Sequence, residues 1–89
     1  MSKIKNSTLR KPKNSLRKLL FEIASKSSNP ESSLNEIRST ICFDLEISRK
    51  LLTYYEENRK PIAFDHLAYL VQVISEKYTK ITVSDLMEF

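Results

Sequence analysis

Residues 41–61, ICFDLEISRKLLTYYEENRKP, decide the fold that this sequence predicts. Ser48 is a residue type that accepts an unsatisfied backbone N–H at a helix start, so we expect a helix over 48–57. Asn58 and Pro61 end that helix, because Asn tolerates the left-handed conformation after a helix and Pro disfavours helix in the residue before it. A short break before Ser48 separates this helix from an earlier one.

The sequence before this stretch predicts two further helices. Leu residues at 16, 19 and 20 and Ile at 23 repeat at helical spacing, which predicts a helix from residue 14 or 15 to about 25–27. Ser33 followed by Glu36 has the form of a capping box. We therefore expect the second helix to begin there, to place Leu34, Ile37 and Ile41 on one face, and to end at about Phe43 or Asp44.

The sequence after it predicts two more. Apolar residues from Leu67 to Tyr78 share one face of an expected helix over 64–78, and Thr82 opens a short last turn or helix that carries Val83, Leu86 and Met87. With 89 residues there is room for one domain. We expect an all-α fold, a compact bundle of about five short helices over residues 14–89, preceded by a flexible basic arm over residues 1–13.

Composition excludes several classes of function. The absence of glycine removes the P-loop, the dinucleotide fingerprint, the nucleophile elbow and the EF-hand, which all depend on it. One cysteine and one histidine exclude a disulfide framework and multi-cysteine or histidine-rich metal sites. We expect Cys42 in the core, His66 on the surface of the helix over 64–78, and Glu56 and Glu57 in solvated or capping roles. The prediction is a protein that is not an enzyme, with no cofactor and no metal.

Positive charge is concentrated at the start of the chain. Residues 1–18 carry seven basic and no acidic residues, whereas residues 19–89 carry eight basic and eleven acidic ones. The arm is either a solubilising tail or a tether that binds phosphates or enters a minor groove. A reducing compartment and no membrane span are expected, although an organellar transit peptide stays an alternative. The basic residues of the arm are Lys3, Lys5, Arg10, Lys11 and Lys13.

From Ile37 to Met87 the sequence resembles the helix-turn-helix domain of the Cro/CI-repressor-like (XRE) family, which includes lambda repressor. The resemblance rests on a small residue, a turn, an isoleucine, a capping Ser, a mid-helix apolar residue, a Tyr-Glu pair and a polar loop that ends in Pro. These are Cys42, Glu46, Ile47, Ser48, Leu52, Tyr55, Glu56 and Asn58 through Pro61. The resemblance implies transcriptional regulation by sequence-specific DNA binding, in the cytoplasm at the nucleoid.

Two positions differ from the family pattern. The family commonly has Gly where this chain has Glu46, and a non-Gly residue with positive φ costs about 1 kcal/mol. Asn58 also stands where Gly is common. Glu56 resembles a residue that the family often pairs with an arginine of the first helix, for which Arg17 is the candidate.

A helix enters the major groove of DNA only when a second helix braces it, so Ile41, Ile47, Leu52 and Tyr55 are expected to face inward. Arg, Lys, Thr and Tyr side chains can hydrogen-bond bases or phosphates, and Leu can contact a thymine methyl group. The expected base contacts are Arg49, Lys50, Leu51, Thr53 and Tyr54. The expected phosphate contacts are Arg38, Ser48, Asn58, Arg59 and Lys60.

The family also implies a symmetric dimer on double-stranded DNA, with Leu86, Met87 and Phe89 as its candidate interface. A terminal Phe could equally close the core. Two alternatives stay open. One is a protein-interaction adaptor or antitoxin-like partner on the same scaffold, favoured by the negative balance of residues 19–89, and the other is nonspecific nucleic-acid binding through the basic arm.

Overall fold

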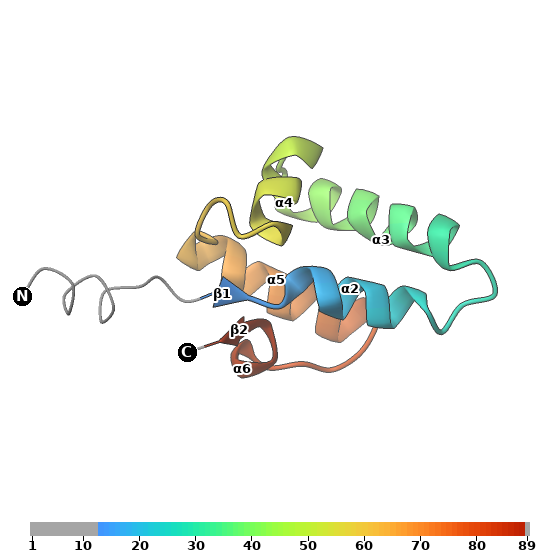
Figure 1. Cartoon of the computed structure of the whole chain (residues 1–89). Coiled ribbons are helices and arrows are strands. Elements are labelled where there is room, and N and C mark those ends of the chain that lie inside the picture. Colours follow the sequence, from blue (N-terminus) through green and yellow to red (C-terminus); the bar gives the residue numbers. More distant parts are fainter. Residues whose placement is uncertain (1–12, 89) are drawn as a thin grey trace, which may run out of the picture.

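A computed structural model describes residues 13–88, and the side chains of 13–87 (Figure 1). Over that range the prediction of a mostly helical fold with five helices is confirmed. The helices are α2 (Leu16–Ala24), α3 (Pro30–Leu45), α4 (Arg49–Glu56), α5 (Phe64–Lys77) and α6 (Val83–Leu86).

Two short strands join the ends of the described chain. β1 (Lys13–Asn14) and β2 (Met87–Glu88) pair antiparallel, and the N–H of Ser15 donates to the carbonyl of Leu86 at 2.6 Å. We expected no strand at all. A two-residue strand has no measurable alternation of apolar and polar residues, so only the packing of the chain ends reveals it.

The core lies between α2, α3 and α5, and α4 and α6 cover its ends (Figure 1). Of the four side chains expected to brace α4, Ile41, Leu52 and Tyr55 are buried and Ile47 is partly buried, which confirms that face. Val83 is 42% exposed, so the last helix buries only Leu86 fully. The buried apolar residues are Leu16, Leu20, Ala24, Ile37, Ile41, Leu45, Leu52, Tyr55, Leu70, Val73, Ile74, Ile81 and Leu86.

The start of α3 differs from the prediction. The side chain of Asn29 accepts from the N–H of Ser32 at 3.3 Å, and Pro30 occupies the first helical position. The predicted start at Ser33 with Glu36 is wrong, because Pro at the first position has the helical φ already and needs no N–H partner. A capping box does occur at α6, between Thr82 and Asp85.

The turn from α3 to α4 spans residues 46–48. Glu46 has φ 56° and ψ 46°, in the left-handed region, and its N–H donates to carbonyls at the end of α3. The hydroxyl of Ser48 accepts from the N–H of Leu51 at 3.0 Å, as an N-cap does. The expected left-handed Glu46 and the Ser48 cap are therefore confirmed.

A Glu46→Gly variant should be more stable than the unaltered chain. Glycine adopts positive φ without steric cost, so we expect a gain of about 0.5–1 kcal/mol, a rise of a few degrees in the thermal unfolding midpoint. Thermal unfolding followed by circular dichroism measures it. Glu46→Ala is the control, since alanine keeps the β-carbon, and an equal rise in both variants would contradict the explanation.

Candidate nucleic-acid interface

One face of α4 packs against the core and the other reaches solvent. Leu52 and Tyr55 are buried, whereas Arg49, Lys50 and Thr53 are exposed. Of the other predicted base-contact residues, Leu51 and Tyr54 are half-buried. The structure thus brings the five predicted residues onto one short helix but leaves three of them open to solvent.

The guanidinium of Arg49 lies against α3 in this state. Its Nη2 donates to Oδ1 of Asn35 at 3.1 Å, and its Nη1 reaches Oγ of Ser39 at 3.5 Å. Both bonds are exposed to solvent, so each contributes little to stability. The two hydrogen bonds hold Arg49, the first residue of α4, against α3. Its guanidinium has to break them before it can reach a DNA base.

Two of the basic residues predicted to contact DNA lie over the ring of Tyr54. Lys50 Nζ and Arg59 Cζ each lie 5.9 Å from its centroid, within reach of a cation–π attraction. Arg59 also pairs with Glu57, Nε to Oε1 at 3.0 Å. Two predicted base contacts, Lys50 and Tyr54, and one predicted phosphate contact, Arg59, therefore form one cluster along α4 and the loop after it.

Arg38, predicted as a phosphate contact, is held in a partly buried ion pair instead. Its Nε and Nη2 donate to the two carboxylate oxygens of Glu56 at 3.0 and 2.7 Å. The Glu56 side chain is 3% exposed, so its expected solvated or capping role is wrong. A carboxylate at the end of one helix can be buried when a second helix supplies a two-pronged partner. No local pattern signals this pair, because its members lie on different helices.

Arg17 of α2 completes the cluster, as expected for Glu56. Its Nε is 3.9 Å from Oε1 of Glu56, a longer contact than that of Arg38. The guanidinium carbons of Arg17 and Arg38 lie 6.0 and 5.9 Å from the ring centroid of Phe21. Glu56 and Phe21 together fix two arginines between α2, α3 and α4.

Asn14 is a residue that the sequence analysis missed. Its Nδ2 donates to the Tyr55 carbonyl at 2.8 Å, and its Oδ1 accepts from the N–H of Leu16 at 3.0 Å. Its backbone N–H and carbonyl bond the side-chain amide of Asn58, at 2.8 and 3.2 Å. Asn58 is left-handed, with φ 58°. This asparagine pair ties β1 to the end of α4, and only the tertiary structure reveals it.

His66 and Cys42 have structural surroundings. His66 is half-buried and its Nδ1 lies 2.7 Å from the hydroxyl of Tyr55, so the expected surface position is wrong. Tyr55 draws it inward because a buried phenol hydroxyl needs a partner. Cys42 is half-buried, and burial raises the pKa of its thiol while Arg49 lowers it. Within residues 13–88 no group of three or more His, Cys, Asp or Glu could hold a metal ion.

The predicted arm falls mostly outside the described residues. Lys3, Lys5, Arg10 and Lys11 lie there, whereas Lys13 is exposed in β1. Among residues 13–88 no helix is long and apolar enough to cross a membrane.

The structure also corrects the candidate dimer interface predicted at the end of the chain. Leu86 is fully buried in the core of the single chain, so its expected place in a dimer interface is wrong. Met87 is half-buried, and Phe89 lies outside the described residues.

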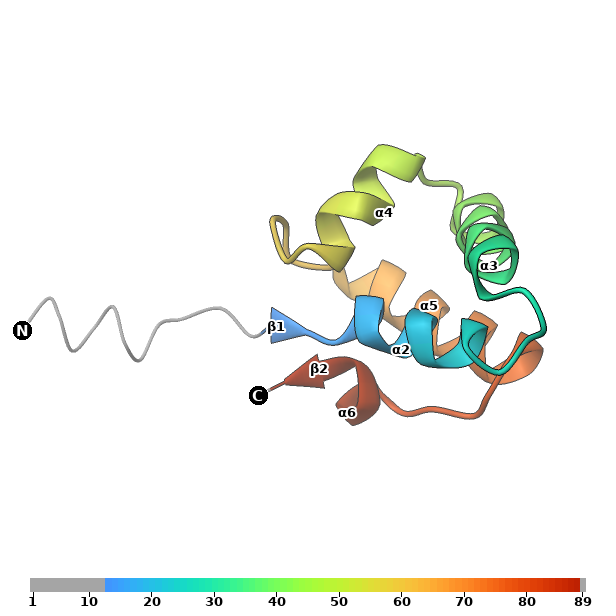
Figure 2. The same ribbon diagram turned by 45° about the vertical axis from the view of Figure 1, so that its right-hand side comes forward.

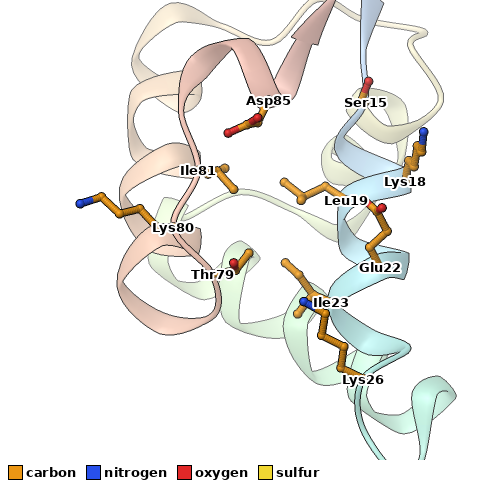
Figure 3. A pocket seen from close by; sticks show the side chains of 10 residues that line it. All are labelled: Ser15, Lys18, Leu19, Glu22, Ile23, Lys26, Thr79, Lys80, Ile81 and Asp85. Atoms are coloured by element: carbon orange, nitrogen blue, oxygen red, sulfur yellow. The ribbon is translucent and has the colours of Figure 1, made fainter.

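A hollow of about 410 Å³ lies between α2 and the segment after α5 (Figure 3). Leu19 and Ile23 point from α2 toward Ile81 across it. Lys18 and Asp85 are among the charged residues that line it, so both signs of charge are present.

No protein-family model matches the sequence, and neither a curated protein nor a solved structure gives a significant match to it.

Proposed function

We propose that this chain is a sequence-specific DNA-binding protein of the Cro/CI-repressor-like kind that regulates transcription, with α4 as its major-groove helix. The observation that carries the proposal is the pairing of α4 with α3. A capped eight-residue helix follows a tight turn, packs its apolar side on the core and presents Arg49, Lys50 and Thr53 to solvent. A recognition helix needs this combination of a fixed brace and a polar outer face.

The proposed roles follow from donor geometry. Arg49 and Lys50 would donate to guanine, Thr53 and Tyr54 to bases or phosphates, and Leu51 would contact a thymine methyl group. Ser48, Arg59 and Lys60 would hold phosphates on either side of the groove. The side-chain amide of Asn58 is bonded to the backbone of Asn14, so Asn58 acts in this proposal by tying β1 to the end of α4. Arg38 acts in this proposal through its pair with Glu56, which positions the end of α4.

The distribution of charge supports a DNA interface confined to α4 rather than a general electrostatic attraction between the helical domain and DNA. Residues 13–88 carry eleven basic and eleven acidic residues, whereas residues 1–12 carry four basic and no acidic ones. Specific binding must then come from the arrangement on α4, and the first twelve residues would add a salt-sensitive, sequence-independent contribution.

The test is selection of binding sites from random duplex DNA by the full chain. We expect enrichment of a defined motif, which becomes palindromic if the protein binds as the proposed symmetric dimer. Arg49→Ala with Lys50→Ala should abolish the enrichment, since each bidentate contact supplies about 1–3 kcal/mol of discrimination. Lys77→Ala with Lys80→Ala removes the same charge away from α4 and should leave the motif unchanged.

Other results would contradict the proposal. Absence of enrichment at low salt would exclude a specific regulator. Binding that ignores sequence and disappears when residues 1–12 are removed would assign nucleic-acid affinity to the arm alone.

A protein-interaction function is the second candidate, and two exposed aromatic residues favour it. Phe43 on α3 is 83% exposed and Phe64 on α5 is 85% exposed. An adaptor or antitoxin-like protein would bury such rings against a partner. In that case Phe43→Ser with Phe64→Ser should abolish partner binding without changing the fold, and the chain should bind no DNA.

A further inference from the structure

The first turn of α2 carries charge of the unfavourable sign for a helix start. Arg17 and Lys18 lie there, and the turn contains no acidic residue. A cation near the N-terminal end of a helix opposes the helix dipole, so these two residues reduce the stability of α2. Arg17 offsets this cost through its contacts with Glu56 and Phe21, whereas no ion pair with a described residue does so for Lys18.

Tertiary contacts bring this turn beside the end of α4. Asn14 bonds both Asn58 and the carbonyl of Tyr55, and Arg17 reaches Glu56. Figure 2 shows β1 and the start of α2 next to the end of α4 and the loop that follows it. That loop contains Arg59 and Lys60, which the proposed function places on phosphates.

A hollow of about 710 Å³ lies between these segments, and two cations and one carboxylate are among the residues that line it. Arg17 and Lys18 line it together with Glu56 and Asn58. The carboxylate of Glu56 is already bonded by Arg38. Lys18 forms no ion pair with any residue that the structure describes, and its charge is free to act on a ligand.

We infer that Lys13, Arg17 and Lys18, here named the α2 basic edge, bind the phosphate backbone of the same DNA duplex that α4 contacts. The inference rests on the proposed function and extends it from α4 to a second element. The asparagine pair holds the edge in register with α4, so both bind one duplex at once. The four basic residues that precede Lys13 continue the same positive charge along the chain.

Lys18→Glu separates a DNA-binding role of the α2 basic edge from a structural one. Lys18→Glu places a carboxylate in the first turn of α2, where the gain from the helix dipole is opposed by repulsion from Glu22 four residues on, so the thermal unfolding midpoint should change by no more than a few degrees. The same change repels phosphate, and we expect at least a tenfold loss of affinity for duplex DNA. Lys18→Ala should lower the slope of log affinity against log salt by about 0.9, the value for one lost phosphate contact.

Lys26→Glu is the matched control. Lys26 is exposed and lies just beyond the opposite end of α2, so the variant has the same net charge but leaves the edge intact. Its affinity should stay within about twofold of the unaltered chain, because charges far from the contact are screened. Fluorescence anisotropy with a labelled duplex, repeated from low to moderate salt, measures the unaltered chain and the three variants.

This experiment distinguishes a failure of the α2 basic edge from a failure of the proposed function. If the unaltered chain binds duplex DNA and the two charge reversals weaken it equally, the α2 basic edge is excluded and the proposed function stands. If Lys18→Ala leaves the salt slope unchanged, the edge is excluded as well. If the unaltered chain binds no duplex at low salt, both are overturned.

Discussion

Glu56→Ala is expected to lower the free energy of unfolding by about 2–4 kcal/mol, the largest loss among single substitutions of the charged residues that the structure describes. The variant removes both acceptors of Arg38, whose side chain is only 22% exposed, and also the longer ion-pair contact from Arg17. Small domains have few kcal/mol in reserve. The variant should therefore unfold at a clearly lower urea concentration, and urea unfolding followed by circular dichroism gives the difference.

Glu57→Ala is the control from the neighbouring position. Glu57 pairs with Arg59, whose side chain is 67% exposed, and such a pair contributes about 0–1 kcal/mol. Replacing both members of the buried pair, as Arg38→Met with Glu56→Leu, should recover part of the loss because no buried charge is left unpaired. Equal effects of Glu56→Ala and Glu57→Ala would show that burial of the pair contributes nothing.

Asn14→Ala is expected to cost about 2–3 kcal/mol, because it leaves the buried N–H of Leu16 without a partner and leaves the Tyr55 carbonyl only its bond from the N–H of Asn58 and its helix-end bond from Glu57. Asn14 is 7% exposed, and its side chain satisfies the carbonyl of Tyr55 and the N–H of Leu16. Alanine satisfies neither. The loss should appear in urea unfolding as a lower midpoint with an unchanged slope, since the folded state stays compact.

Asn35→Ala is the matched substitution at an exposed site. The Asn35 side chain bonds the exposed guanidinium of Arg49, so Asn35→Ala should lower the free energy of unfolding by no more than about 0.5 kcal/mol.

Two substitutions of Asn58, the other member of the asparagine pair, test its backbone strain and its hydrogen bonds separately. They are Asn58→Gly and Asn58→Ala. Both lose the bonds to Asn14, but alanine also keeps the cost of a positive φ, about 1 kcal/mol. Asn14→Ala keeps the backbone bonds of Asn14 to Asn58, so a variant as stable as Asn35→Ala would contradict the role of the Asn14 side chain, whereas the Asn58 variants test the pair itself.

Helices were predictable where the sequence repeats at helical spacing and carries a local end signal. Ser48 and Asn58 bound α4 as expected, since a cap and a left-handed residue act within a few positions of the chain. The start of α3 was misplaced because Asn29 with Pro30 competes with the capping-box pattern of Ser33 and overrides it.

The candidate site was predictable only in part. Arg49, Lys50 and Thr53 follow from helical spacing, because the residues opposite Leu52 and Tyr55 must face solvent. The position of the arginine side chains does not follow. Arg49 lies on α3 and Arg38 is bound to Glu56, since the shape and charge of a neighbouring helix decide where a long side chain rests.

The sequence by itself determined the helical content, the turn at Glu46, the capped α4 and the excess of positive charge before α2, because each depends on residues that are near neighbours in the chain. The tertiary structure alone decided the pair of Arg38 with Glu56, the pair of Asn14 with Asn58 and the short β1–β2 ladder. These contacts join residues 18, 44 and about 74 positions apart, and only burial of the shared core brings such groups within hydrogen-bond distance.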